Sequence, residues 1–432
     1  MVRGNILTHI ANRSRGYIAL LRDPLYRSTL LLVLSSLANA MLGFIFWIVA
    51  ARLYSAVDVG LVAALTAASG LMAMLASLGF PTALLRFLSQ SDDRRAMVNS
   101  IFTTSIVLSI VFSAIFIAGT PLWSPELVFL KGRVVAFAMF TLVTAGTALS
   151  YSQSHAFIAL RRPGLAFVLV FVSALLRIPL AIALARFGLV GLWVTWGLFL
   201  ALNFIMFVIL FRLTQPGYLP APAFSRALLK GVLSFSVSSL LAEVPYATIV
   251  SILPLMVLNA LGPEATAYYY VAFRFSSFLF SVATFAGMAL LVEGSYDPGK
   301  LRQNVLKAMR FSLLILAPAL LVISLIGDKL LLLFGRDYSE QALTVVWLIS
   351  AASLPHIVIE FYIAVRRVQM RMLSVLTVTW AVLVMNLGIA WPALNAFGLA
   401  GSGAGWLVSY SVVAAAIVLL LARRRLVGKR AS

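Results

Sequence analysis

Twelve apolar runs, each about as long as a membrane-crossing helix, constrain the fold of this chain more than any other feature. A helix rises about 1.5 Å per residue, so roughly 20 apolar residues cross the hydrocarbon core of a bilayer. With 62% hydrophobic and 11% charged residues, the chain has more apolar surface than a soluble domain buries. The sequence therefore predicts an all-α integral membrane protein with twelve transmembrane helices, near residues 29–50, 60–85, 98–118, 134–158, 165–185, 189–211, 231–258, 265–292, 309–327, 342–364, 374–394 and 399–421.

The second half of the chain repeats short stretches of the first half, in the same order and at offsets of 205 to 210 residues. Each half holds six helices, an even number, so both copies cross the membrane in the same orientation. This predicts two six-helix bundles related by a parallel pseudo-twofold axis, an arrangement that places the substrate site of transporters between the halves. The matching stretches are Ala83–Leu85 with Ala289–Leu291, Ile158–Arg162 with Ile363–Arg367, and Phe187–Gly191 with Phe397–Gly401.

The helix positions divide the chain into five predicted segments. They are an amphipathic cytoplasmic lead-in (1–27), an N-terminal six-helix lobe (28–212), a cytoplasmic linker (213–229), a C-terminal six-helix lobe (230–422) and a basic cytoplasmic tail (423–432).

Basic residues are distributed unevenly between the two predicted membrane faces. Twenty-five of the 33 lie in the terminal segments and in the loops after even-numbered helices, and six lie on the opposite face. Loops rich in Lys and Arg stay in the cytoplasm, so both termini are predicted to be cytoplasmic in a multi-pass protein. The same distribution accounts for the net charge of +20 without a nucleic-acid partner.

Three ionisable side chains lie deep within the predicted spans. By helical rise, Arg177 and Glu243 lie about 22 and 20 Å from the inner-face residues Arg162 and Lys230, and Arg274 lies about 15 Å from Glu264 at the outer face. A guanidinium group keeps its charge at low dielectric and matches phosphate oxygens with paired donors. Arg177 and Arg274 are therefore predicted to bind an anionic substrate. The alternative is that each arginine only pairs with a buried carboxylate such as that of Glu243.

Three acidic or imidazole side chains are candidates for coupling transport to an ion. Glu243 lies near Pro245 and Pro254, which predicts a bent helix with unpaired carbonyls and a site for H⁺ or Na⁺. His356 and Glu360 share a helix face by i, i+4 spacing and could relay protons. The alternatives are a fixed ion pair for Glu243 and a structural pair for the other two. No cofactor and no metal site are expected.

Three motifs occur in order along the chain. They are ARLYSAVDVG at Ala51–Gly60, GFPTALLRF at Gly79–Phe87 and LFGRDY at Leu333–Tyr338. Together with the twelve helices, they resemble the polysaccharide and oligosaccharide flippase (Wzx-type) family of the multidrug/oligosaccharidyl-lipid/polysaccharide exporter superfamily. Lipid II flippases of that superfamily usually carry two further C-terminal helices, which this chain lacks.

The resemblance implies a MATE-like fold in a prokaryotic cytoplasmic (inner) membrane. It also implies a flippase that moves an undecaprenyl-pyrophosphate-linked oligosaccharide to the outer leaflet for O-antigen or exopolysaccharide biosynthesis, by alternating access. Arg52, within the first motif, is the third residue predicted to bind substrate. The expected partners are the lipid-linked oligosaccharide, membrane lipids, and polymerase and glycosyltransferases of the same pathway. Tyr268–Tyr270 are expected to form an aromatic belt at the membrane interface.

Two other classes of protein compete with this prediction. A cation-coupled multidrug exporter is expected to carry acidic groups in its cavity, whereas the deep arginines favour an anion. A polysaccharide polymerase or ligase usually has a large outer loop, and the longest outer loops here, near 119–133 and 328–341, are short. The sequence has no phosphate-binding glycine loop and no HExxH motif, so neither an enzyme nor an ATP-driven pump is expected.

Overall fold

The computed structural model describes the backbone of residues 24–296 and 298–430. It describes the side chains of residues 38–225, 231–294 except 234, 242 and 292, and 299–423. The predicted lead-in up to residue 23 and the last two residues of the predicted basic tail lie outside the described residues.

Helices make up all the regular structure of the described chain, and most are long enough to cross a bilayer. In chain order they are α2 (Pro24–Leu53), α3 (Ala56–Ser77), α4 (Phe80–Phe87), η1 (Leu88–Gln90), α5 (Arg94–Trp123), η2 (Pro125–Leu130), α6 (Val134–Ala159), α7 (Pro163–Ala183), η3 (Ala185–Phe187), α8 (Gly188–Thr214), α9 (Arg226–Tyr296), η4 (Pro298–Lys300), α10 (Leu301–Leu331), α11 (Arg336–Val368), α12 (Met372–Phe397) and α13 (Leu399–Arg430).

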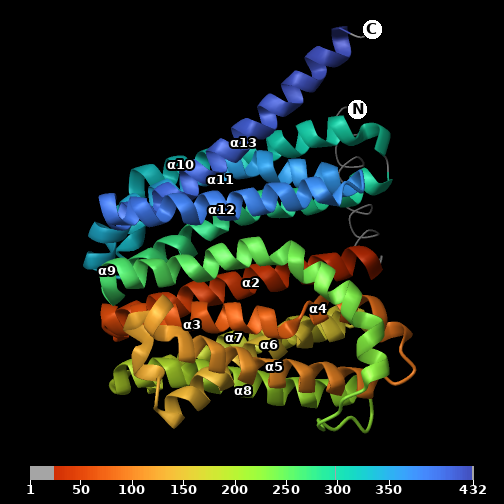
Figure 1. Cartoon of the computed structure of the whole chain (residues 1–432), viewed down its shortest axis with the longest axis vertical. Coiled ribbons are helices and arrows are strands. Elements are labelled where there is room, and N and C mark those ends of the chain that lie inside the picture. The colour runs from red at the N-terminus through yellow and green to blue at the C-terminus, as the bar shows by residue number, and fades with distance from the viewer. Residues whose placement is uncertain (1–23, 297, 431–432) are drawn as a thin grey trace, which may run out of the picture.

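The helix α9 contains two membrane crossings. Gly262 has φ 86°, outside the helical region, and the chain reverses there into a first arm (226–261) and a second arm (263–296) (Figure 1). Ten helices in the described part, α9 among them, are long and apolar enough to cross a membrane. Counting both arms of α9 and adding the 30-residue α2 gives twelve crossings. The predicted all-α membrane fold is confirmed.

The second predicted helix, near 60–85, is broken in the structure. Leu78 and Gly79 have φ of 47° and 74°, so α3 ends there and the short α4 begins with Pro81 in its first turn. A Cβ at Gly79 would also lie 2.1 Å from the Ser236 carbonyl oxygen in α9. Glycine is needed here both for its backbone conformation and for the close approach of another helix.

The molecule has two halves with α9 between them (Figure 1). Helices α2 to α8 form one half and α10 to α13 the other. The start of α2 and the loop between α11 and α12 lie at one end of the bundle, here called the terminal end. The turn at Gly262 lies at the opposite end, here called the far end (Figure 1). Both α2 and the first arm of α9 run from the terminal end to the far end, as a parallel repeat requires. The predicted segment boundaries themselves stay predictions.

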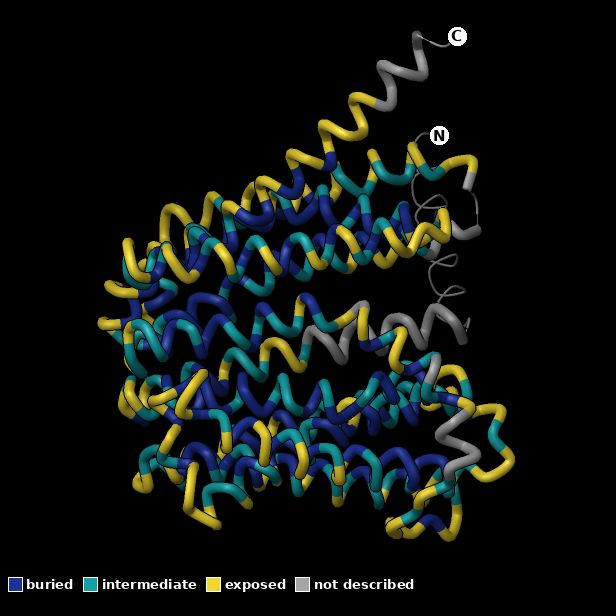
Figure 2. The backbone as a smooth tube through the Cα atoms, viewed as in Figure 1, coloured by how far each residue is buried: buried dark blue, intermediate teal, exposed yellow. Residues whose placement is uncertain are grey.

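The helix α3 packs against α9 along most of its length and is the most enclosed of the crossings. In its most apolar stretch, 72% of residues are buried, compared with 17% for α10. Alanine and glycine dominate α3, and small residues let helix backbones approach closely. A Cβ at Gly60 would lie 1.7 Å from the Pro263 carbonyl oxygen, so the two helices touch through backbone atoms. Figure 2 shows buried residues inside each half and exposed ones around the periphery.

Candidate functional site

Arg274 lies in the second arm of α9, one helical turn after Tyr270. Its Nη2 donates a hydrogen bond of 2.5 Å to the Tyr270 hydroxyl, and its guanidinium carbon lies 4.9 Å from the centre of the Tyr270 ring. The Nε atom of Arg274 is buried without a hydrogen-bond partner. The tyrosine holds the guanidinium group in place and leaves part of its donor capacity unused.

Arg177 in α7 is buried among aromatic rings. Its guanidinium carbon lies 4.2 Å from the ring centre of Phe46, 4.4 Å from that of Trp196 and 5.1 Å from that of Phe199. A cation over a desolvated aromatic face gains about 2 kcal/mol. The rings therefore stabilise the charge of Arg177, yet its Nε also has no hydrogen-bond partner.

Neither deep arginine is neutralised by a carboxylate in the described part of the chain. The ion pairs there join Arg336 to Glu340 and His356 to Glu360. The alternative interpretation, in which Arg177 or Arg274 pairs with Glu243, is not what the structure contains. The positive charges of the two arginines instead act on each other across the interior of the molecule.

Two tyrosines, one from α6 and one from α9, lie within electrostatic range of Arg274. Tyr151 in α6 and Tyr246 in the first arm of α9 both interact electrostatically with this arginine. Their side chains are 40% and 49% exposed, so their surfaces are accessible. This role was not predicted, because a tyrosine in the middle of an apolar helix looks the same in the sequence whether it faces lipid or a binding site.

The positions of Tyr269 and Tyr270 contradict the predicted aromatic belt at the membrane interface. Tyr269 and Tyr270 are 0% and 4% exposed, and Tyr270 lies against Trp47 of α2 with ring centres 4.7 Å apart. These rings belong to the packed interior and to the setting of Arg274. The prediction was wrong because the rotation of the helix about its own axis decides which face of the eighth crossing points inward. The sequence does not reveal this rotation.

The candidate ion-coupling residues lie nearer the terminal end than Arg274. Glu243 is exposed, lies beside Thr82 of α4 and is within electrostatic range of Arg367. The carboxylate of Glu360 is also within range of Arg367. Arg367 lies in the last turn of α11, so a single basic group acts on both carboxylates.

His356 and Glu360 lie on one face of α11, as their spacing predicted. His356 Nε2 is 3.7 Å from Glu360 Oε1, and the imidazole packs against the rings of Phe280 (4.8 Å) and Tyr410 (5.4 Å). The Nδ1 atom of His356 is buried with no hydrogen-bond partner. In the described chain, no group of three His, Asp or Glu side chains could hold a metal ion.

Arg52 lies at the far end, where it connects the two halves. Its Nε donates a hydrogen bond of 2.8 Å to the Leu333 carbonyl, and its Nη2 donates to the Leu332 carbonyl. Both carbonyls follow the end of α10, where backbone acceptors lack helical partners. Arg52 is the third residue predicted to bind substrate. In this conformation its guanidinium group instead donates hydrogen bonds to these carbonyls.

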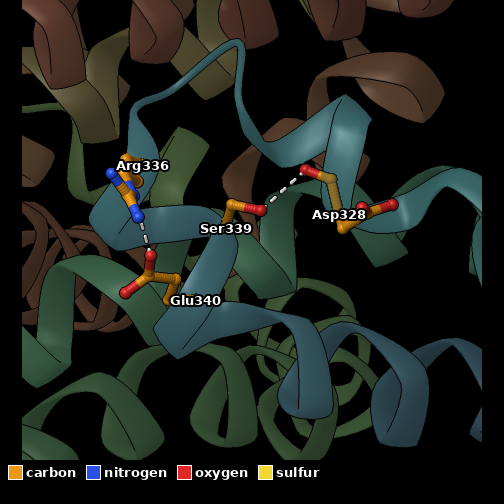
Figure 3. A network of polar contacts seen from close by, with 4 residues as sticks. All are labelled: Asp328, Arg336, Ser339 and Glu340. Carbon is orange, nitrogen blue, oxygen red and sulfur yellow. Dashed lines mark hydrogen bonds and ion pairs between the residues drawn. The ribbon is translucent and has the colours of Figure 1, made fainter.

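The turn that receives Arg52 is held by its own polar contacts (Figure 3). Ser339 Oγ donates a hydrogen bond of 2.8 Å to the Asp328 carbonyl, and Arg336 forms a 3.0 Å ion pair with Glu340. Gly335 has φ 144°, a conformation that favours glycine. The LFGRDY motif thus builds the rigid turn between α10 and α11.

Aromatic packing reinforces the contact between the halves at the far end. Phe44 of α2 lies 5.2 Å, centre to centre, from the ring of Phe334, which follows α10. It also lies 5.6 Å from Phe278 and 5.9 Å from Phe275, both in the second arm of α9. The hydrogen bonds and ring contacts between the described parts of α2–α8 and α10–α13 all lie at this end. The far end is therefore closed.

Solved structures of membrane transporters share this fold. The chain aligns with the inward-facing conformation of a multidrug resistance MATE family transporter of the MOP superfamily at 17% identity and TM-score 0.64, covering 92% of this chain and 96% of that one. For the lipid II flippase MurJ in an inward closed conformation, the identity is 12% and the TM-score 0.68, with 90% and 87% covered. An outward-facing MATE family transporter gives 16% identity and TM-score 0.56, with 96% and 98% covered. At these identities the likeness is one of fold.

Comparison by sequence gives two further findings. No curated protein matches the chain. The family described as polysaccharide biosynthesis protein matches residues 49–343, a stretch that contains all three motifs and most of the membrane crossings. Because this match covers well over half of the sequence, the chain belongs to the polysaccharide biosynthesis protein family.

Proposed function

We propose that this protein is a flippase that moves an undecaprenyl-pyrophosphate-linked oligosaccharide from the cytoplasmic to the outer leaflet by alternating access. The observation that carries the proposal is the pair of arginines, Arg177 and Arg274, that lie deep in the molecule without a carboxylate partner. Family membership and the fold shared with MurJ support the same class of substrate.

An unpaired cation at membrane depth is costly, so such groups usually face a cavity, a partner or a ligand. The aromatic rings around Arg177 and Tyr270 beside Arg274 reduce this cost but supply no opposite charge. A pyrophosphate group would supply it and accept the free N–H donors in paired geometry. A cationic drug would be repelled by the same two charges, so this arrangement disfavours multidrug export.

The orientation and the coupling are parts of the same proposal. The terminal end is cytoplasmic, because most basic residues lie there, and the closed far end faces outward. An inside-negative potential assists outward movement of a pyrophosphate by about 2.3 kcal/mol per charge per 100 mV. A cation bound at Glu243, or at Glu360 with His356, resets the empty carrier. The terminal end of the bundle would admit the substrate from the cytoplasmic leaflet.

Transport of a lipid-linked oligosaccharide in proteoliposomes tests the proposal. We expect Arg274→Ala to reduce substrate affinity by about 10- to 150-fold, because a hydrogen bond to a charged group contributes about 1.5–3 kcal/mol. Arg274→Lys should recover only part of this loss, since an ammonium group lacks the paired donors of a guanidinium.

Arg336→Ala provides the matched control, because Arg336 pairs only with Glu340 at the surface of the far end. This variant should transport at the wild-type rate. Full transport by Arg274→Ala would contradict the proposed role of the arginines. Export of cationic dyes by the wild-type protein, without transport of the lipid-linked sugar, would favour a multidrug exporter.

A further inference from the structure

An apolar groove of about 530 Å³ lies between the second arm of α9 and the first half of α10. Its lining contains three alanines, here called the floor of the groove, and three large side chains, here called its walls. Phe285, Phe311 and Ile315 in the walls are 40%, 59% and 40% exposed, and α10 is the least buried of the crossings. The groove is therefore open to the surrounding membrane. Its floor consists of Ala286, Ala289 and Ala308.

The groove is polar only at the terminal end. Along α9 it runs from Val282 to Glu293, and along the antiparallel α10 it runs from Ile315 back to Asn304. Each stretch covers eleven helical steps, or about 16 Å. Half of a hydrocarbon core of about 30 Å is nearly the same length. The groove thus extends from one membrane interface to the bilayer midplane, as an acyl chain of that leaflet does.

Two opposite charges stand unpaired at the polar mouth of the groove. Glu293 and Lys307 both line it and are both exposed, yet neither forms an ion pair with a described side chain. Asn304, one turn before Lys307 in α10, also lines the groove and adds hydrogen-bond capacity. An anionic headgroup would satisfy Lys307 but meet repulsion from Glu293. A headgroup that carries both a phosphate and an ammonium group satisfies both residues.

We propose that this groove binds one zwitterionic phospholipid with a primary ammonium headgroup, from the leaflet at the terminal end. The headgroup phosphate binds Lys307 and Asn304, and the ammonium group binds Glu293. One acyl chain lies along the alanine floor between the phenylalanine walls. This site is separate from the arginine site, because no lining residue of the groove is among the contacts of Arg177 or Arg274.

Native mass spectrometry of the full chain in detergent tests the proposal. The probes are three phospholipids with identical acyl chains and ethanolamine, choline or glycerol headgroups. We expect one ethanolamine lipid to bind about two- to fivefold more tightly than the glycerol lipid, the range of an exposed charge pair. Glu293→Gln should remove this preference, and Lys307→Gln should weaken binding of all three lipids.

Two matched controls lie at the far end of the molecule, where Glu340→Gln and Lys329→Gln remove the same charges without touching the groove. Both should bind lipid as the wild type does. Ala308→Phe places a large side chain in the floor of the groove and should abolish the tight binding of one lipid. If this variant does not fold, Ala289→Leu fills the groove with a smaller side chain. Size-exclusion chromatography verifies that each variant is folded.

Three results would overturn the proposal. The first is an unchanged headgroup preference in Glu293→Gln. The second is a preference of the wild type for the anionic lipid, which would assign the groove to another ligand, such as the tail of the transported lipid. The third is a change of oligomeric state in folded Ala308→Phe, which would make the groove a contact between two copies of the chain.

Discussion

At the scale of single residues, the molecule stabilises buried cations with aromatic rings. Three rings surround Arg177, and Tyr270 holds Arg274 by a hydrogen bond and a ring contact. A buried carboxylate in the same place would neutralise each arginine permanently and compete with an anionic substrate. Aromatic stabilisation keeps the guanidinium groups charged and available.

Glu243→Gln tests the proposed coupling. Glu243 is exposed, so a cation can reach it. We expect the variant to bind substrate in detergent but to lose the stimulation of transport by a proton or Na⁺ gradient in proteoliposomes. Glu264→Gln, in the turn at the far end, is the control. If Glu243→Gln keeps the wild-type gradient dependence, coupling belongs to His356 and Glu360.

Arg52→Gln tests the contact between the halves at the far end. Glutamine can replace at most one of the two hydrogen bonds of Arg52, and loss of the other, about 1.5 kcal/mol, should increase the open population about tenfold. Spin labels on cysteines at Lys131 and Glu340, both exposed at the far end, would report this as a longer distance. Arg336→Gln should leave the distance unchanged. If the distance between the labels in Arg52→Gln equals that in the wild type, the aromatic contacts of Phe44 alone hold this end together.

At the scale of helices, α3 is the element on which the two halves close. It lies against α9 at both ends, with Gly60 at the Pro263 carbonyl and the following Gly79 at the Ser236 carbonyl. Both glycines belong to the motifs, which are therefore explained by helix contact and backbone conformation. The GFPTALLRF motif additionally ends α3 and starts α4.

Gly60→Ala tests the closure of α3 on α9. A methyl group cannot fit 1.7 Å from the Pro263 carbonyl oxygen, so the closed far end should lose about 1–3 kcal/mol. The same spin labels should then report a population shift of roughly 5- to 150-fold towards the open far end. Gly70→Ala in the same helix meets no atom within 4 Å and should not shift the distance. Equal distances in the two variants would refute the role of Gly60.

At the scale of the whole molecule, two helical halves meet at the far end, and the basic loops gather at the terminal end. The end rich in Lys and Arg is also the end where the described parts of α10–α13 make no hydrogen bond or ring contact with α2–α8, although Arg86 and Phe87 of α4 pack there against Phe235 of α9. A carrier in this conformation would receive an anionic headgroup at its basic end. The exposed Glu243 and the deep Arg274 are both within electrostatic range of Tyr151.

Cysteine labelling tests the orientation. The chain has no native cysteine, so a single introduced thiol gives an unambiguous signal. We expect Ser89→Cys at the terminal end to react with a membrane-impermeant maleimide only from the cytoplasmic side, and Lys131→Cys at the far end only from outside. Both positions are exposed. The reverse pattern would invert the proposed direction of transport.

The sequence alone determined the features that depend on local periodicity and on bilayer thickness. The twelve crossings follow from apolar runs of about 20 residues, and the shared face of His356 and Glu360 follows from the helical repeat. The turn at Gly262 and Pro263 was likewise visible in the chain. These features need no knowledge of which helices are neighbours.

Only the tertiary structure decided which helix faces meet. Lipid is as apolar as the interior of a helix bundle, so the hydrophobic pattern of a membrane helix does not mark its inward face. For this reason the sequence did not predict the rings around Arg177, the contact of Arg274 with Tyr270, or the backbone carbonyls that bind Arg52. Gly79 and Pro81 are local signals for the break after α3, but the close approach of Ser236 to Gly79 joins residues more than 150 positions apart and could not be read from the sequence.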